Sequence, residues 1–324
     1  MIAVRTLRVP ARLRRSGRRG ATSTSTSARP VAPSTPPQAI PPLSPRLQLV
    51  RAVLVMVSVL CVMLLVHLTV LSSLQHQAAQ RVAYADFREQ VATGQAVAGP
   101  TTEDGALLEL GAPVAHLEIP QLGLSEVVLE GTTSGVLFDG PGHRRDTPLP
   151  GQVGTSVLLG RRAAFGGPFG DLQRLRSGDE MTVTTAQGRF VFRVLGVRRA
   201  GDPLPPPRAA GSSRLVLVTA SGTPFLPDGI ISVDADLDGT AVGGAARPFS
   251  AASLPDSERA LSGDTSRLVV LLLWLQALFV ASLLFVVSWH RWGRAQTWLV
   301  LGPPIVVVAL FVGDEIVRLL PNLM

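Results

Sequence analysis

Long apolar segments constrain this chain of 324 residues more than any other feature of its sequence. Two of them, 52–74 and 268–289, contain no Arg, Asp or Glu. A helix needs about 20 apolar residues to cross the roughly 30 Å hydrocarbon layer of a membrane. Both segments reach that length, so we predict transmembrane helices over 52–74 and 268–289. The mean hydropathy of +0.33 is high for a soluble protein and agrees with this prediction.

A third apolar segment predicts another transmembrane helix, over 298–320. It contains Gly302 to Pro304, so this helix must be kinked or supported by a neighbouring helix. Asp314 and Glu315 lie near its far end, where we expect an interfacial ion pair with Arg318 at helical spacing. The alternative is that the two carboxylates act in transport or in a proton relay.

The distribution of charge predicts how the chain crosses the membrane. Residues 1–51 contain ten Arg and no acidic residue, whereas residues 75–267 contain 17 Arg against 21 Asp and Glu. Short arginine-rich flanks stay in the cytoplasm. We therefore expect a multi-pass protein of the plasma membrane with a cytoplasmic N-terminus, residues 75–267 outside, a cytoplasmic turn at 290–297, and the end of 298–320 outside. The net charge of +7 is thus a topology signal and does not indicate a nucleic-acid partner.

The segments on either side of the first predicted helix differ in composition. Residues 1–48 are rich in Arg, Ser, Thr and Pro, which predicts a disordered cytoplasmic tail. A cleaved secretory signal is the competing interpretation of 52–74, but the length of apolar sequence and the tail before it favour an uncleaved anchor. Residues 75–112 predict a stalk, with a short amphipathic helix ending at Gly94 and then a loop.

Residues 113–238 change to the alternating pattern of short β-strands separated by Gly- and Pro-rich turns. The clearest hairpin turns at 186–188. Many short strands with little helix indicate a mainly β fold, a small barrel or sandwich. A linker over 239–267 then leads back to the membrane.

Several landmarks occur along this β region in a characteristic order, and together they resemble the sortase family over residues 113–238. They are Ile119-Pro120, Gly142-His143, the strand from Ser156, Gly170 to Leu172, Gly178 to Glu180, and the strand that ends at Thr219. The resemblance implies an eight-stranded β-barrel with flanking transmembrane helices, on the surface of Gram-positive-type bacteria. Sortases cleave a sorting motif near the C-terminus of a surface protein and join that protein to cell-wall material or to another subunit.

The same resemblance implies a Cys nucleophile, a His acid/base and an Arg that stabilises the oxyanion, and this chain matches none of them. Arg161 stands at the His position and Ala220 at the Cys position. The place of the Arg is filled by 226–233, and no Arg lies between Arg214 and Arg247. Acyl transfer needs an activated nucleophile and an oxyanion donor, which the methyl group of Ala220 cannot supply. We therefore expect no catalytic residue of the family type.

An alternative is that the protein is an enzyme with a nucleophile other than Cys. Ser221 or Thr219 could attack as a hydroxyl if His143 served as the base. Cys61, the sole cysteine, lies within 52–74, so thiol chemistry in the external region is excluded. The isolated histidines predict no metal site, and no phosphate-binding loop or other cofactor motif is present.

The remaining polar groups at the site position suggest binding. Arg161, Arg162 and Thr219 would edge the former active-site groove, and guanidinium groups suit carboxylates or phosphates. The competing possibility is that both Arg side chains point to solvent. The sequence thus favours a sortase-like pseudoenzyme that binds or scaffolds surface-protein sorting peptides, or an active sortase, at the membrane.

Overall fold

The computed structural model describes residues 44–96, 98–99, 101, 107–244 and 250–324. The predicted disordered tail, 1–48, lies outside the described residues except for its last five. The chain divides into two units, Met1–Leu49 and Val50–Met324, and the second contains the barrel and the helices around it, apart from the first residues of the first helix.

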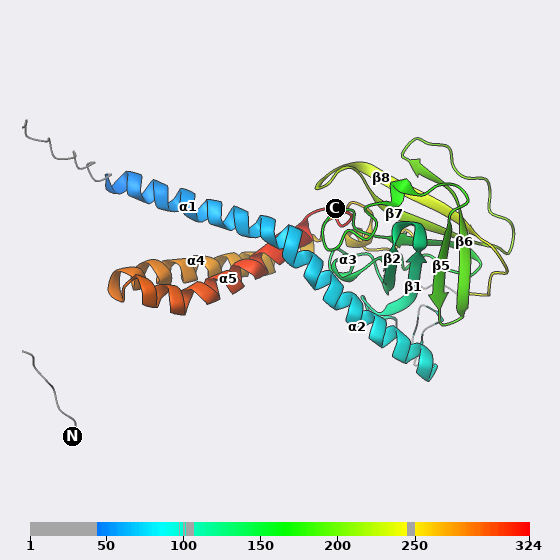
Figure 1. Ribbon diagram of the computed structural model, residues 1–324, viewed down its shortest axis with the longest axis horizontal. Helices are drawn as coiled ribbons and strands as arrows, with labels where there is room; N and C mark the ends of the chain where they lie inside the picture. The colour runs from blue at the N-terminus through cyan, green and yellow to red at the C-terminus, as the bar shows by residue number, and fades with distance from the viewer. Residues whose placement is uncertain (1–43, 97, 100, 102–106, 245–249) are drawn as a thin grey trace, which may run out of the picture. The chain divides into compact units, whose positions relative to one another are not determined.

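Eight β-strands close into a barrel in the order β1-β2-β3-β4-β7-β8-β6-β5 (Figure 1). The mainly β, eight-stranded fold class predicted from the sequence is therefore confirmed. The strands are β1 (Pro113–Ile119), β2 (Leu124–Glu130), β3 (Gly142–His143), β4 (Gly154–Leu159), β5 (Glu180–Thr185), β6 (Gly188–Arg199), β7 (Ser213–Thr223) and β8 (Leu226–Leu237).

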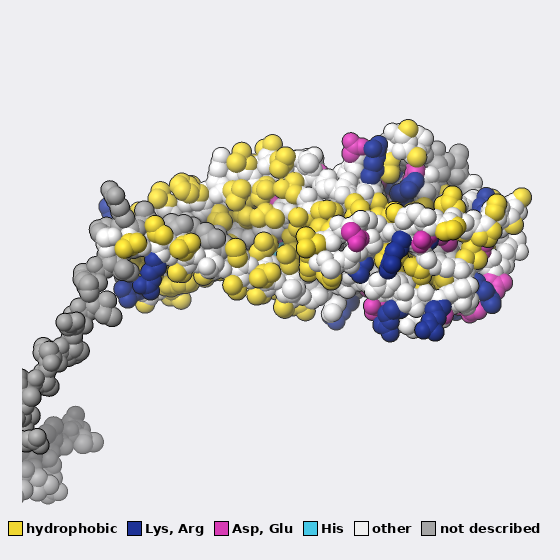
Figure 2. All heavy atoms as spheres, turned by 90° about the horizontal axis from the view of Figure 1, so that it is seen from above, with side chains coloured by type: hydrophobic (Ala, Val, Ile, Leu, Met, Phe, Trp, Pro, Cys, Tyr) yellow, Lys and Arg dark blue, Asp and Glu magenta, His cyan; other side chains and the backbone are white. Residues whose placement is uncertain are grey.

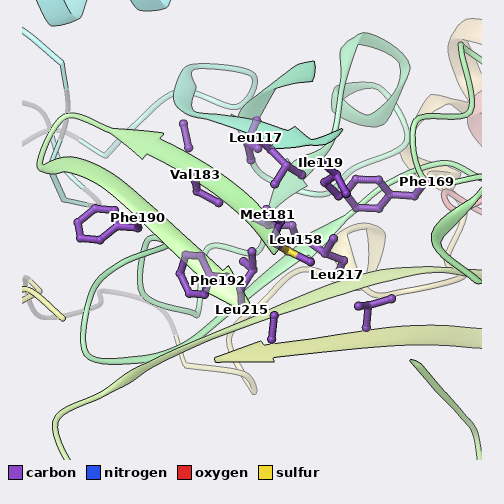
Figure 3. Packing of buried hydrophobic residues seen from close by; sticks show 14 of the residues in the cluster. Leu117, Ile119, Leu158, Phe169, Met181, Val183, Phe190, Phe192, Leu215 and Leu217 are labelled. Carbon is purple, nitrogen blue, oxygen red and sulfur yellow. The ribbon is translucent and has the colours of Figure 1, made fainter. Parts of the chain in front are cut away.

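Alternating side chains fill the barrel interior. On β5, Met181 and Val183 are completely buried, while the residues between them are partly exposed. They meet Leu117, Phe192 and Leu215 from other strands in one apolar cluster (Figure 3). Because successive side chains of a strand point to opposite faces, the period-2 sequence pattern alone specifies which side chains enter this core.

One long helical segment precedes the barrel. It consists of α1 (Pro45–Val66), one π-helical turn (His67–Leu71) and α2 (Ser72–Thr93), and it ends where Gly94 adopts a left-handed conformation with φ of 75°. Its α2 part was predicted as a stalk, but it packs on the barrel. Phe87 is buried against Val127 and Leu129 of β2.

Two further helices follow the barrel, α4 (Leu268–Arg291) and α5 (Arg294–Leu319). They pack on each other, with the rings of Trp274 and Phe311 stacked 4.6 Å apart between centroids. By length and composition, three helical stretches could cross a membrane, namely Cys61–Thr93, Thr265–Trp289 and Arg294–Leu319. Figure 2 shows hydrophobic side chains spread over the helices, whereas charged side chains gather on the barrel. Pro303 and Pro304 lie inside α5, and α4 packs against this helix. A neighbouring helix is one of the two ways in which we expected a helix with these prolines to be accommodated.

The carboxylates of α5 do not form the ion pair that the sequence suggested. Asp314 lies 2.8 Å from the imidazole of His67, measured from Oδ1 to Nε2. Arg318 instead places its guanidinium 5.0 Å from the ring centroid of Phe138. The expected pairing of Asp314 and Glu315 with Arg318 is wrong because tertiary packing gives Asp314 a buried partner from the π-helical turn, which helical spacing within α5 cannot reveal.

The segment predicted as a linker, 239–267, also contributes to the fold. Glu258 is completely buried and forms an ion pair with Arg145. Leu254 is buried as well, and Val242 forms an isolated β-bridge with Gln152. Because a buried carboxylate is stable only with a partner, this ion pair attaches the segment to the barrel.

Replacing a central core side chain tests the barrel assignment. Phe192→Ala should lower the free energy of unfolding by about 3–5 kcal/mol, because it leaves a cavity in a closed core. The thermal unfolding of the full chain in detergent measures this loss. Leu204→Ala is the matched control, since Leu204 is 79% exposed and its replacement should change stability by less than about 0.5 kcal/mol. Equal stability of the two variants would contradict the register described here.

Candidate functional site

Parallel pairing of β4 with β7 builds the site. Val157 pairs with Val216 and Leu159 with Val218. The pairing continues beyond β4, because the amide of Gly160 donates to the carbonyl of Val218 at 3.0 Å. The residues that follow, Arg161 and Arg162, therefore lie beside the end of β7.

Antiparallel pairing of β7 with β8 adds the third wall. Ala220 is opposite Ile230, and Thr219 is opposite Ile231. The barrel thus brings together Arg161, Ala220 and the 226–233 segment, the three places where the sequence departs from the family pattern. At each place the side chain present lacks the chemistry that acyl transfer requires.

Arg161 is buried, with only 1% of its surface exposed. Its guanidinium donates to the main-chain oxygens of Met324 and Ser134, at 3.2 and 3.3 Å, and lies 4.5 Å from the centroid of the Phe138 ring. Burial, together with the nearby charge of Arg318, lowers the pKa of Arg161 to about 9. Arg161 therefore still carries its charge at neutral pH, and among the described residues no Asp or Glu side chain pairs with it.

Arg162 has a different environment. Its Nη1 donates to the carbonyl of Ala220 at 2.8 Å, while the side chain also lines an open pocket of about 480 Å³. Glu126 and Asp171 contribute carboxylates to the same pocket. The two arginines predicted to edge one groove are thus separated: Arg161 is enclosed by protein, and Arg162 reaches an open, polar surface.

The last residues of the chain also pack at the site. Their position was not predicted from the sequence. Leu323 is completely buried in a cluster with Leu159 and Ala220. Its carbonyl accepts a hydrogen bond from the amide of Arg162 at 3.0 Å. The only available signal was Pro321, which predicts that α5 ends before it and says nothing of where the following residues bind.

The hydroxyls of the alternative nucleophiles have no imidazole beside them. Ser221 donates to the carboxylate of Asp228 at 2.5 Å. Thr219 is buried, and its hydroxyl has no hydrogen-bond partner among the described residues.

His143, the proposed base, is completely buried and engaged elsewhere. Its Nδ1 lies 2.8 Å from a carboxylate oxygen of Glu130, and its Nε2 lies 3.1 Å from the carbonyl of Pro148. The hydroxyl near its Nε2 belongs to Thr147, at 3.3 Å. These contacts fit a structural histidine that links β2 with the turn after β3.

Metal-ligating residues do not gather anywhere in the described part of the chain. Within it, no group of three or more His, Cys, Asp or Glu residues is close enough together to hold a metal ion.

Comparison with known proteins identifies the barrel. Residues 117–221 match the family model of the sortase domain. The barrel thus contains a match to the sortase domain. Sortase D of Bacillus subtilis is 30% identical to this chain over 87 residues, which are 27% of the chain and 42% of that protein. The matched part is thus less than half the length of that relative.

Solved sortase structures are similar to the same region. A sortase D5 transpeptidase from Clostridium perfringens is 20% identical, with a TM-score of 0.42 over 50% of this chain and 99% of that chain. Sortase E from Streptomyces avermitilis is 30% identical, with a TM-score of 0.35 over 47% of this chain and 100% of that chain. The sortase resemblance inferred from the landmark residues is confirmed.

A substitution of His143 separates a structural from a catalytic role. His143→Ala leaves the buried carboxylate of Glu130 without its hydrogen-bond partner and should lower the free energy of unfolding by about 1–3 kcal/mol. His116→Ala is the control, because His116 is only half-buried and its ring contacts the exposed hydroxyl of Ser125. Thermal unfolding of the full-length variants makes the comparison. Unchanged stability of His143→Ala would contradict the structural role.

Proposed function

We propose that this chain is a membrane-anchored, non-catalytic member of the sortase family on the outer surface of a bacterial cell. In this role it binds surface-protein sorting peptides, or scaffolds an active sortase, without cleaving a peptide bond. The observation that carries the proposal is the composition of the site. Arg161, Ala220 and the segment 226–233 lie together, and the sortase resemblance implies an acid/base, a nucleophile and an oxyanion donor at these positions.

The chemistry of each position supports this proposal. A buried guanidinium donates hydrogen bonds but has no lone pair with which to take a proton, so Arg161 cannot act as a general base at neutral pH. The methyl group of Ala220 cannot form an acyl intermediate. The side chain of Ile230 offers no donor to an oxyanion. Because all three groups are absent from one site, a binding role is favoured over an enzyme with a different nucleophile.

The open pocket beside Arg162 supports a binding role. Arg162 stays partly exposed there, next to the carboxylates of Glu126 and Asp171. A surface with both charges can hold the polar groups of an extended peptide. The enzyme alternative, with Ser221 or Thr219 as nucleophile, gains no support from the contacts of His143.

A combined binding and cleavage assay tests the proposal. The purified full-length protein is incubated with peptides that carry sorting motifs, and an active sortase serves as the positive control. We expect binding without cleavage products, and the same result for Ser221→Ala and Thr219→Ala. Cleavage by the wild-type protein that disappears in Ser221→Ala would overturn the non-catalytic assignment.

Cysteine labelling tests the proposed topology. Cys61 is the only cysteine, so Cys61→Ser provides a background free of thiols. Leu204→Cys in the barrel should react with a membrane-impermeant maleimide on intact cells, because its side chain is 79% exposed. Trp292→Cys, in the turn after α4, should react only after the cells are permeabilised. The reverse pattern would contradict a barrel on the outer face.

A further inference from the structure

The segment 320–324, Leu-Pro-Asn-Leu-Met, contacts the barrel as a turn, in which the amide of Met324 donates to the carbonyl of Pro321 at 3.1 Å. It leaves α5 at Leu319, and Pro321 prevents continuation of the helix. Asn322 is completely buried and fixes the segment at its middle. Its side-chain amide donates to the carbonyls of Thr132 and Arg259, at 2.9 and 3.0 Å, and its main-chain amide donates to the carbonyl of Ser262 at 2.9 Å.

Leu323 occupies an apolar site made by the walls of the former catalytic position. Its side chain packs with Leu137, Leu159 and Ala220, and none of its surface is exposed. Its carbonyl accepts from the amide of Arg162. One buried side chain combined with main-chain hydrogen bonds is a set of contacts by which a protein can bind a short peptide segment.

The residue after Leu323 satisfies a buried charge. The main-chain oxygen of Met324 accepts from Nη1 of Arg161, and Ser134 supplies the other acceptor. The Nε of Arg161 has no partner among the described residues. Because an unsolvated guanidinium is costly, loss of Met324 would leave Arg161 with one protein acceptor.

We propose that the groove beside Ala220 is a peptide-binding site whose resident ligand is the chain's own segment 320–324. A peptide from outside then binds by displacing this segment, and the preferred ligand is a short peptide that places a Leu side chain against Ala220 and main-chain oxygens on Arg162 and Arg161. This inference rests on the proposed non-catalytic role, since an active nucleophile at 220 would face the bound segment.

A peptide competition assay with the full-length protein in detergent tests this inference. The probe is a fluorescent peptide of residues 318–324, Arg-Leu-Leu-Pro-Asn-Leu-Met, and a scrambled peptide is the control ligand. Leu323→Asp should expel the resident segment, because a carboxylate cannot remain in the apolar site. Leu204→Asp is the matched control, the same substitution at an exposed position of the barrel.

We expect Leu323→Asp to bind the probe at least about tenfold more tightly than the wild type, because apparent affinity falls with the fraction of protein whose groove is open. Leu204→Asp should bind as weakly as the wild type, and the scrambled peptide should bind to neither. Equal affinity of wild type and Leu323→Asp would overturn the resident-ligand proposal and leave the proposed function intact. Failure of folded Leu323→Asp to bind the probe would also overturn the resident-ligand proposal. The assay with sorting-motif peptides on this variant tests the proposed function separately.

A second measurement does not depend on the folding of Leu323→Asp. In the Cys61→Ser background, Leu323→Cys should react with a maleimide at least about tenfold more slowly than Leu204→Cys, because the groove covers residue 323. Addition of the unlabelled peptide of residues 318–324 should accelerate the labelling of Leu323→Cys alone. Labelling of the two cysteines at equal rates would overturn the proposal.

Discussion

The guanidinium of Arg161 is a positive charge enclosed by protein, and the site is arranged around the need to solvate it. Main-chain oxygens of Ser134 and Met324 accept two of its hydrogen bonds, and the stacked rings of Phe138 and Phe165 lie within reach of its charge. These partners come from three distant parts of the sequence. Each of these partners supplies part of the solvation that water would otherwise provide. The buried charge therefore depends on all of them staying in position.

Strand pairing explains why this charge lies beside the end of β7. β4 and β7 are parallel neighbours, so the residues after Leu159 and those at the end of β7 must meet at one end of the barrel. β8 returns beside β7 and brings Ile230 opposite Ala220. These pairings place Arg161, Ala220 and Ile230 at one end of the barrel, where their side chains take part in hydrogen bonding and packing.

The sequence predicted the barrel well and the site in part. Alternating patterns and ordered landmarks are local signals, so they were sufficient for the strands and for the sortase resemblance, whereas the positions assigned to Arg161 and Ala220 stay predictions. The burial of Arg161, the Asp314–His67 pair and the position of Leu323 depend on contacts between segments more than a hundred residues apart. Neither hydropathy nor spacing carries that information, which is why the ion pair expected within α5 was replaced by one between helices.

The non-catalytic role makes a direct prediction about covalent chemistry. A sortase that uses any nucleophile must pass through an acyl-enzyme, whose mass exceeds that of the free protein by the acyl fragment of the peptide. Intact-protein mass spectrometry of the wild-type chain during incubation with a sorting-motif peptide therefore tests it most directly. A non-catalytic protein should give a single species at the mass of the unmodified 34.2 kDa chain. A second species, heavier by the acyl fragment and mapped to Ser221 or Thr219, would contradict it.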